Sequence, residues 1–144
     1  MNTRTADRQS QHKSVVRRLY REVWTDADFS NVAKFVTPQV IFHFRGRSFS
    51  QSPETLILIV TRWHQAFSDL RFDVQALVAE GDFVSARVRY RGVHVGEWKG
   101  MSPTGRTVEV HEMLFFRFQE GRIAEVWEVT DEYALRQQLS TTDE

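Results

Sequence analysis

Residues 103–131, PTGRTVEVHEMLFFRFQEGRIAEVWEVTD, form the stretch that decides the fold. Branched and aromatic side chains dominate residues 107–118 and 122–130, and the Glu120-Gly121 pair between them is typical of a tight turn. The stretch therefore predicts two long antiparallel strands joined as a hairpin. Among their apolar side chains lie four groups able to hold or move protons: Glu109, His111, Trp127 and Asp131.

The turn decides which side chains of this hairpin share a face. A three-residue loop with Gly121 in the left-handed conformation gives a bulged hairpin, in which Phe118 pairs with Arg122. Counting back along the strands then places Glu109 opposite Asp131. Because side chains alternate along a strand, all four groups project from one face. A plain two-residue turn would shift the register by one residue and remove Asp131 from its partners. The position of the glycine favours the bulged form.

The composition is that of a globular domain. The chain has 144 residues, of which 41% are hydrophobic, and its 19 basic and 19 acidic side chains give a formal net charge of zero. This balance argues against nucleic-acid or anionic-membrane partners. The absence of cysteine excludes disulfides and thiol catalysis. No apolar run could span a bilayer and the start does not resemble a signal peptide, so we expect one cytoplasmic domain with disordered tails at 1–11 and 140–144.

Helices are predicted before the hairpin, with a short one after it. Apolar side chains recur on one helical face from His12 to Trp24, and Ser52-Pro53 is a strong helix start. The predicted helices cover residues 12–24, 29–36, 52–67 and 132–139, and further strands cover residues 40–44, 72–78 and 83–94.

This order of elements favours an α+β fold, in which a strongly curved antiparallel sheet wraps around the N-terminal helices. Such a sheet leaves a cone-shaped pocket at its open end, where a small molecule can bind. The loop over residues 95–105 is long for a compact domain. Its Trp98 and Met101 suit a flap over an apolar ligand or a dimer contact.

The residue types present favour acid/base chemistry without a cofactor or metal. The five histidines show no paired metal-ligand spacing, and neither a Gly-x-Ser-x-Gly motif nor a glycine-rich phosphate loop occurs. What remains is proton transfer by a carboxylate and a histidine in an apolar cup. Asp131 and His111 are the candidates. Asp131 could instead serve only as the cap of the last helix, and His111 only as a buried, hydrogen-bonded histidine.

Three segments resemble the SnoaL-like polyketide cyclases of the nuclear transport factor 2-like superfamily. They are GEWKGMSPTGR (96–106), FRFQEGRI (116–123), and Glu125-x-Trp127-x-x-x-Asp131 before LRQQL (135–139). The resemblance covers nearly the whole chain. It implies that an aspartate at the position of Asp131 is the general acid/base of an intramolecular aldol closure, with no metal or Schiff base. It also implies a histidine in the first strand, where His43 stands. The chain departs from the family pattern at Ser68-Asp69 and Val93-His94.

We therefore predict a cofactor-independent cyclase or isomerase acting on a polyketide-like or polycyclic small molecule. Asp131 would transfer the proton, and His111 or His43 would hydrogen-bond the reacting carbonyl. The predicted substrate-binding residues are Tyr20, Trp63, Glu109, Met113, Phe115 and Trp127.

Two other functions fit the same fold. An epoxide hydrolase or epoxide-opening cyclase would need a second carboxylate and an arginine inside the cup. In a non-catalytic module for ligand binding or dimerisation, Asp131 would only cap a helix. We expect a homodimer or higher homo-oligomer, and no nucleic-acid or membrane partner.

Overall fold

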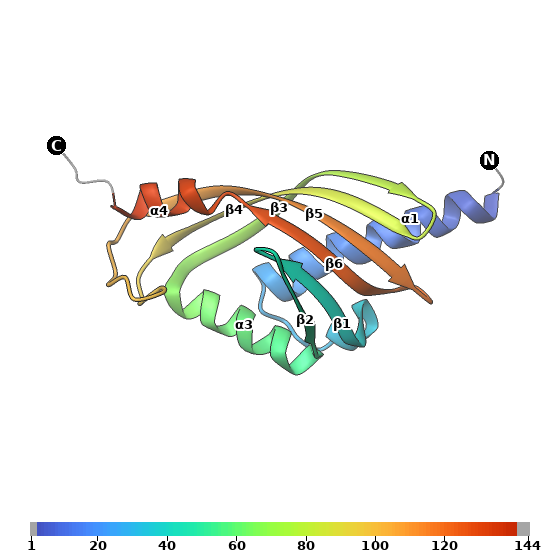
Figure 1. The fold of residues 1–144 in the computed structure, drawn as a ribbon, viewed down its shortest axis with the longest axis horizontal. Helices are drawn as coiled ribbons and strands as arrows, with labels where there is room; N and C mark the ends of the chain where they lie inside the picture. The colour runs from blue at the N-terminus through green and yellow to red at the C-terminus, as the bar shows by residue number, and fades with distance from the viewer. Residues whose placement is uncertain (1–2, 141–144) are drawn as a thin grey trace.

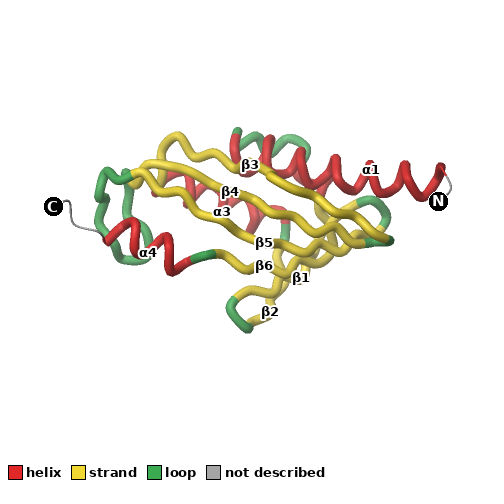
Figure 2. Tube along the Cα trace, turned by 90° about the horizontal axis from the view of Figure 1, so that it is seen from above, coloured by secondary structure: helices red, strands yellow, loops and turns green. Residues whose placement is uncertain are grey.

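Six strands form one sheet, in the order β2-β1-β6-β5-β4-β3, and α1 and α3 lie on the same side of it (Figure 1; Figure 2). The computed structural model describes residues 3–140. Its helices are α1 Thr3–Arg18, the π-helix η1 Leu19–Thr25, α2 Val32–Phe35, α3 Pro53–Ala66 and α4 Glu132–Ser140. Its strands are β1 Val36–Phe44, β2 Arg47–Gln51, β3 Phe67–Glu80, β4 Phe83–His94, β5 Thr107–Gln119 and β6 Arg122–Thr130.

The α+β prediction is confirmed, but the sheet is mixed and not wholly antiparallel. β1 runs parallel to β6, while every other neighbouring pair is antiparallel. The sheet is also open, with β2 and β3 at its edges, so it does not close into a barrel. Alternation along a strand predicts which residues share a face and carries no information on strand direction, which explains the error.

Alternation along β4 and β5 separates an inner face from an outer one. On β5 the even-numbered side chains from Val108 to Phe118 are buried, whereas Thr107, Glu109 and their odd-numbered successors are mostly exposed. The inner side chains pack against η1 and α3 in one apolar core, which includes Val60, Tyr90 and Phe116. One face of the sheet is therefore covered by helices and the other is bare.

The turn between β5 and β6 differs from the predicted one. Glu120 and Gly121 both have positive φ, +50° and +81°, and Gln119 pairs directly with Arg122. This is a two-residue turn, which needs left-handed conformations at both central positions. The predicted pairing of Phe118 with Arg122 is wrong.

A bulge at Ala124 compensates for the tighter turn. Beyond it Arg117 pairs with Glu125, and further along the Asp131 N–H donates to the His111 carbonyl over 3.1 Å. The bulge adds a second one-residue shift to the one made by the turn, so the pairing differs from the predicted one by two residues and each side chain keeps its predicted face. His111 and Asp131 therefore stand opposite each other on one face, although by a different register from the predicted one.

The first helix begins earlier than its apolar pattern indicates. Residues 3–11, predicted to be disordered, form the first turns of α1, whereas residues 1–2 and 141–144 lie outside the described residues. The helix then widens into η1, where Tyr20 is buried and Trp24 is half-buried. His64 of α3 donates from Nε2 to the Trp24 carbonyl over 2.7 Å, which ties the two helices together. No helix in residues 3–140 is long and apolar enough to cross a membrane.

The loop after β4 is fastened to the end of α3. The amides of Val95 and Gly96 both donate to the Ala66 carbonyl, over 2.9 and 3.0 Å. A Cβ added to Gly96 would lie 2.4 Å from the Gln65 carbonyl oxygen, so only glycine allows this approach. The loop turns Trp98 inward, where it is buried.

We expect Gly96→Ala to destabilise the protein by about 1–3 kcal/mol, because the methyl group forces the loop away from rigid helix backbone. Val95→Ala is the matched control: that side chain is 49% exposed, so its removal should change stability by less than about 0.5 kcal/mol. Urea unfolding followed by circular dichroism measures both. Equal stability of the two variants would show that the loop does not depend on this close approach.

Candidate active site

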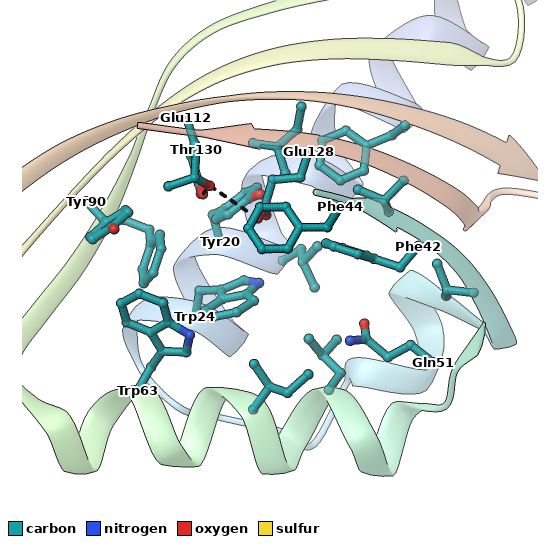
Figure 3. A pocket seen from close by; sticks show the side chains of 18 of the residues that line it. Tyr20, Trp24, Phe42, Phe44, Gln51, Trp63, Tyr90, Glu112, Glu128 and Thr130 are labelled. Carbon is teal, nitrogen blue, oxygen red and sulfur yellow. Dashed lines mark hydrogen bonds between the residues drawn. The ribbon is translucent and has the colours of Figure 1, made fainter. Parts of the chain in front are cut away.

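A cavity of about 250 Å³ lies between the inner face of the sheet, η1 and α3. Its walls are mostly aromatic and aliphatic, with Tyr20 and Trp24 from η1, Trp63 from α3 and Tyr90 from β4 (Figure 3). Trp98 of the loop after β4 adds to this wall. An apolar cavity with a few convergent polar groups is the usual form of a small-molecule site.

The polar centre of the cavity is a pair of carboxyl groups joined by one hydroxyl. Glu112 comes from β5, and Glu128 and Thr130 come from β6. Thr130 Oγ1 lies 3.0 Å from Glu112 Oε2 and 3.2 Å from Glu128 Oε2 (Figure 3). Glu112 stands opposite Thr130 in the ladder, and Glu128 stands opposite Leu114 in the neighbouring inward pair. Strand pairing therefore brings the three groups together.

Burial makes both carboxyl groups unusually hard to ionise. Burial and the negative charge of Glu128 raise the pKa of Glu112 to about 8, and the Thr130 hydrogen bond opposes this only in part. Burial also raises the pKa of Glu128 to about 7, with a further contribution from Glu132. The two groups therefore share one proton near neutral pH, since two buried negative charges so close together repel.

The hydrogen bonds of Thr130 fit this shared proton. A hydroxyl has a single hydrogen, so it can donate to only one of its two carboxyl neighbours. The second short contact is satisfied when the other carboxyl is protonated and donates to Thr130 Oγ1. A protonated and an ionised carboxyl, linked by one hydroxyl, can supply both an acid and a base.

Two phenols add hydrogen-bond donors to the cavity. The Tyr90 hydroxyl is buried and has no hydrogen-bond partner within residues 3–140. Burial, together with the charges of Glu112 and Glu128, raises the pKa of both Tyr20 and Tyr90. Each phenol therefore keeps its proton and can donate to an oxygen of a bound molecule.

The structure brings only part of the predicted site to this cavity. Tyr20 and Trp63 line it. The side chains of Glu109, His111, Met113, Phe115 and Trp127 lie on the outer face of the sheet, opposite the cavity. These hairpin groups do not line this cavity, because the helices cover the even-numbered side chains of β5. Met113, Phe115, Trp127 and Asp131 line a more open hollow on the outer face together with His43, and their catalytic or binding role stays a prediction.

Asp131 and His43 also lie outside the cavity. Asp131 caps α4: its Oδ1 accepts a hydrogen bond from the Ala134 amide over 3.0 Å, and its side chain is exposed. His43 is on the outer face, where its Nε2 lies 2.6 Å from Glu125 Oε2 and its ring stacks on Trp127 at 5.0 Å. The helix cap is the role that this geometry gives Asp131.

Reasoning from the sequence missed Glu112, Glu128 and Thr130. The signal for Glu112 is its place in the alternation, as the one carboxyl among the apolar even-numbered residues of β5. A carboxyl group on the more apolar face of a strand is costly to bury in its ionised form, so its presence there points to a function. Among residues 3–140, no three His, Asp or Glu side chains cluster as they would around a metal ion.

Stability should fall as pH rises through the range where the pair ionises. The folded protein binds more protons than the unfolded chain between the ordinary glutamate value of 4.5 and the raised values near 7 and 8. Unfolding free energy therefore decreases with pH in this window. Glu112→Gln stays neutral, so its unfolding free energy should fall less than that of wild type as the pH rises. Between pH 5 and pH 8 the difference in unfolding free energy between the variant and wild type should shift in favour of the variant by at least about 1 kcal/mol.

The control for this measurement is Glu109→Gln, a change at the exposed neighbouring position on the same strand. Its pH dependence should follow the wild type. Urea unfolding at a series of pH values gives the three curves. Parallel curves for wild type and Glu112→Gln would show that Glu112 ionises normally.

The chain is similar to known proteins along most of its length. Aklanonic acid methyl ester cyclase AcmA from Streptomyces galilaeus is 28% identical over 116 residues, which cover 79% of this chain and 80% of AcmA. The structure of AclR from Streptomyces galilaeus, a proposed hydroxylase, superposes with a TM-score of 0.81 at 25% identity, over 94% of this chain and 85% of AclR. The structure of IdmH from Streptomyces antibioticus superposes with a TM-score of 0.80 at 26% identity, over 91% of this chain and 99% of IdmH.

The family model gives the broadest match. The model of the SnoaL-like polyketide cyclases matches residues 14–139, which include β1 to β6 and nearly all of α4. This match supports a cyclase function. As the sequence resemblance predicts, the chain belongs to the SnoaL-like polyketide cyclase family.

Proposed function

We propose that this protein is a cofactor-independent cyclase that closes a ring in a polycyclic, polyketide-like substrate by an intramolecular aldol reaction. The observation that carries the proposal is the Glu112–Thr130–Glu128 group, which holds an acid and a base together inside an apolar cavity. The relative AcmA is named as a cyclase of aklanonic acid methyl ester, so this ester is the first substrate to test.

The first step is removal of a proton from the carbon beside a carbonyl group. The ionised member of the pair takes this proton, and we assign this role to Glu128 and the protonated role to Glu112. The raised pKa of Glu128 makes it a stronger base than an ordinary glutamate. The electrons of the broken C–H bond form an enolate. The Tyr90 phenol, which is buried and has no hydrogen-bond partner among residues 3–140, is the candidate donor to the enolate oxygen.

The second step forms the new carbon–carbon bond. The enolate carbon attacks another carbonyl carbon of the same molecule, and the resulting alkoxide takes a proton from Glu112, the protonated member of the pair. One proton leaves carbon and one reaches oxygen, so the reaction is an isomerisation that needs no redox partner. Proton exchange through Thr130 returns the pair to its starting state.

This mechanism moves the proposed acid/base from Asp131, His111 and His43 to the inner face of the sheet. The carboxylate of Asp131 caps α4, and the two histidines are on the outer face. The aromatic walls fit a polycyclic substrate, and Tyr20, Trp24 and Trp63 would stack on or beside its rings. They also exclude water, which would otherwise protonate the enolate.

The two alternative functions fit this cavity less well. A second carboxylate is present, as epoxide opening requires, but no arginine lines the cavity within residues 3–140. A purely structural or ligand-binding role does not account for two buried carboxyl groups, because ionising them there costs several kcal/mol of desolvation that no ion pair offsets.

Glu112→Gln and Glu128→Gln should each lower turnover by roughly 10²-fold or more, with substrate affinity largely retained, because each keeps the shape of the cavity and removes one proton-transferring group. Asp131→Asn is the contrasting variant. Asparagine caps helices as well as aspartate does, so this variant should keep turnover within about 3-fold of wild type. Conversion of aklanonic acid methyl ester, followed by mass spectrometry and chromatography, measures all three.

The result for Asp131→Asn decides between the two assignments. A large loss in that variant, with normal turnover in the two glutamine variants, would place the proton transfer at Asp131 and reject the carboxyl pair.

We further propose that a second copy of the chain covers the outer face. Apolar side chains are exposed there on β5 and β6, with Met113 at 52%, Phe115 at 43% and Val129 at 73%. The Glu125 carboxylate beside them is already paired with His43 and with Arg117. Burying this patch therefore removes apolar surface from water without leaving that charge unpaired.

Phe115→Arg should convert a dimer into a monomer, because it places a charge in the centre of the patch. Leu58→Arg on α3 is the control, since that side chain is 49% exposed on the helix side of the molecule. Size-exclusion chromatography with light scattering gives the masses. A monomeric wild type, or dissociation of both variants alike, would reject the outer face as the interface.

A further inference from the structure

Positive side chains gather at one end of the cavity. Lys99 comes from the loop after β4, Arg45 from the turn between β1 and β2, and Arg136 from α4. Lys99 and Glu132 both line the cavity. The Lys99 ammonium lies 4.9 Å from the centre of the Trp98 ring, and the Arg136 guanidinium lies 5.6 Å from it. We call Lys99, Arg45, Arg136 and Glu132 the rim.

The positive charge of the rim exceeds the single negative charge of Glu132. Glu132 forms ion pairs with Arg45 and with Lys99, the latter over 3.7 Å. Arg136 has no carboxylate partner within residues 3–140. Burial lowers the pKa of Lys99, Glu132 opposes this, and Arg45 and Arg136 lower it further. Two cations pair with one carboxylate and a third lies over the Trp98 ring, so the described residues of the rim carry an excess of two positive charges beside an apolar cavity.

The backbone holds Lys99 in a fixed position. Lys99 and Gly100 have φ of +47° and +82° in a two-residue turn, which Trp98 and Met101 close with two hydrogen bonds of 3.0 and 2.9 Å. The left-handed conformation costs a lysine roughly 1–2 kcal/mol, and a residue held in it is fixed by its surroundings. Because the Trp98 ring is buried in the cavity wall, this turn places the ammonium group at the edge of the cavity.

We propose that the rim binds an anionic oxygen of the substrate, a carboxylate or an ionised phenol, while the fused rings lie inside the cavity. This inference rests on the proposed function, because it concerns the substrate of the same site. The ionised member of the carboxyl pair repels an anion from the interior, and the rim attracts it. The two charges together orient the substrate, with its neutral reacting carbons toward Glu128 and its acidic end outward.

The test compares ligands that differ in one charge. Anthraquinone-2-carboxylate, its uncharged methyl ester and 2-hydroxyanthraquinone share a ring system that suits the cavity. Quenching of tryptophan fluorescence reports their binding, because Trp24, Trp63 and Trp98 line the cavity. Titrating 2-hydroxyanthraquinone below and above its ionisation separates a phenolate site from a site that takes carboxylates alone.

We expect wild type to bind the carboxylate about 5-fold more tightly than the ester at low salt, a typical strength for partly exposed charge pairs. The double variant Lys99→Gln/Arg136→Gln should bind both with the affinity of the ester. Arg62→Gln on α3, an exposed cation away from the cavity, should keep the preference. Raising the salt concentration should reduce the preference in wild type and leave ester binding unchanged.

Each outcome has a distinct meaning. If wild type binds ester and carboxylate equally, or if the double variant keeps the preference, the rim only fastens the loop to α4, and the proposed cyclase function stands without it. If none of the three ligands binds, the cavity does not accept polycyclic aromatics, and the rim proposal and the proposed function both fail.

Discussion

The alternation of side chains along β5 and β6 is the constraint on which the rest of the structure depends. It assigns Glu112 and Glu128 to the covered face and His111 and Trp127 to the bare one. The two-residue turn alone would break this assignment, since it changes the pairing by one residue. The bulge at Ala124 restores it, so a single extra residue keeps both carboxyl groups inside.

Burial of the carboxyl pair lowers the stability of the core and, by the same desolvation, raises the pKa of the carboxyl groups. Apolar side chains such as Val110, Leu114 and Phe116 stabilise the inner face of β5, and Glu112 interrupts them at the centre. The same desolvation that disfavours its ionisation raises its pKa into the range where proton transfer is efficient. Thr130 limits the cost by offering one hydroxyl to both carboxyl groups. The core is therefore less stable at the point where, in the proposed mechanism, the reacting carbon of the substrate would lie.

The sequence predicts the elements better than it predicts which face of the hairpin is functional. The Ser52 cap and the start of α3 at Pro53 follow from local chemistry, and the structure has both. The aromatic stripe of the first helix places Tyr20 in the cavity wall. Both faces of β5, however, carry large apolar side chains: Phe116 inside and Phe115 outside. Only the packing of η1 and α3 decides which face is covered, and that depends on contacts between distant segments.

The junction of β6 and α4 shows why an aspartate outside the cavity can still matter to the site. The side chains of Glu128 and Thr130 point inward from the last residues of β6. Asp131 follows and caps α4, and Glu132 and Arg136 of α4 belong to the rim. The cap therefore fixes where α4 starts relative to the carboxyl pair. A capping side chain at position 131, aspartate or asparagine, serves this geometry whether or not it exchanges a proton with substrate. In the mechanism proposed above, a sequence signature that includes Asp131 would mark the position of the site, while the proton transfer would belong to the side chains that point inward.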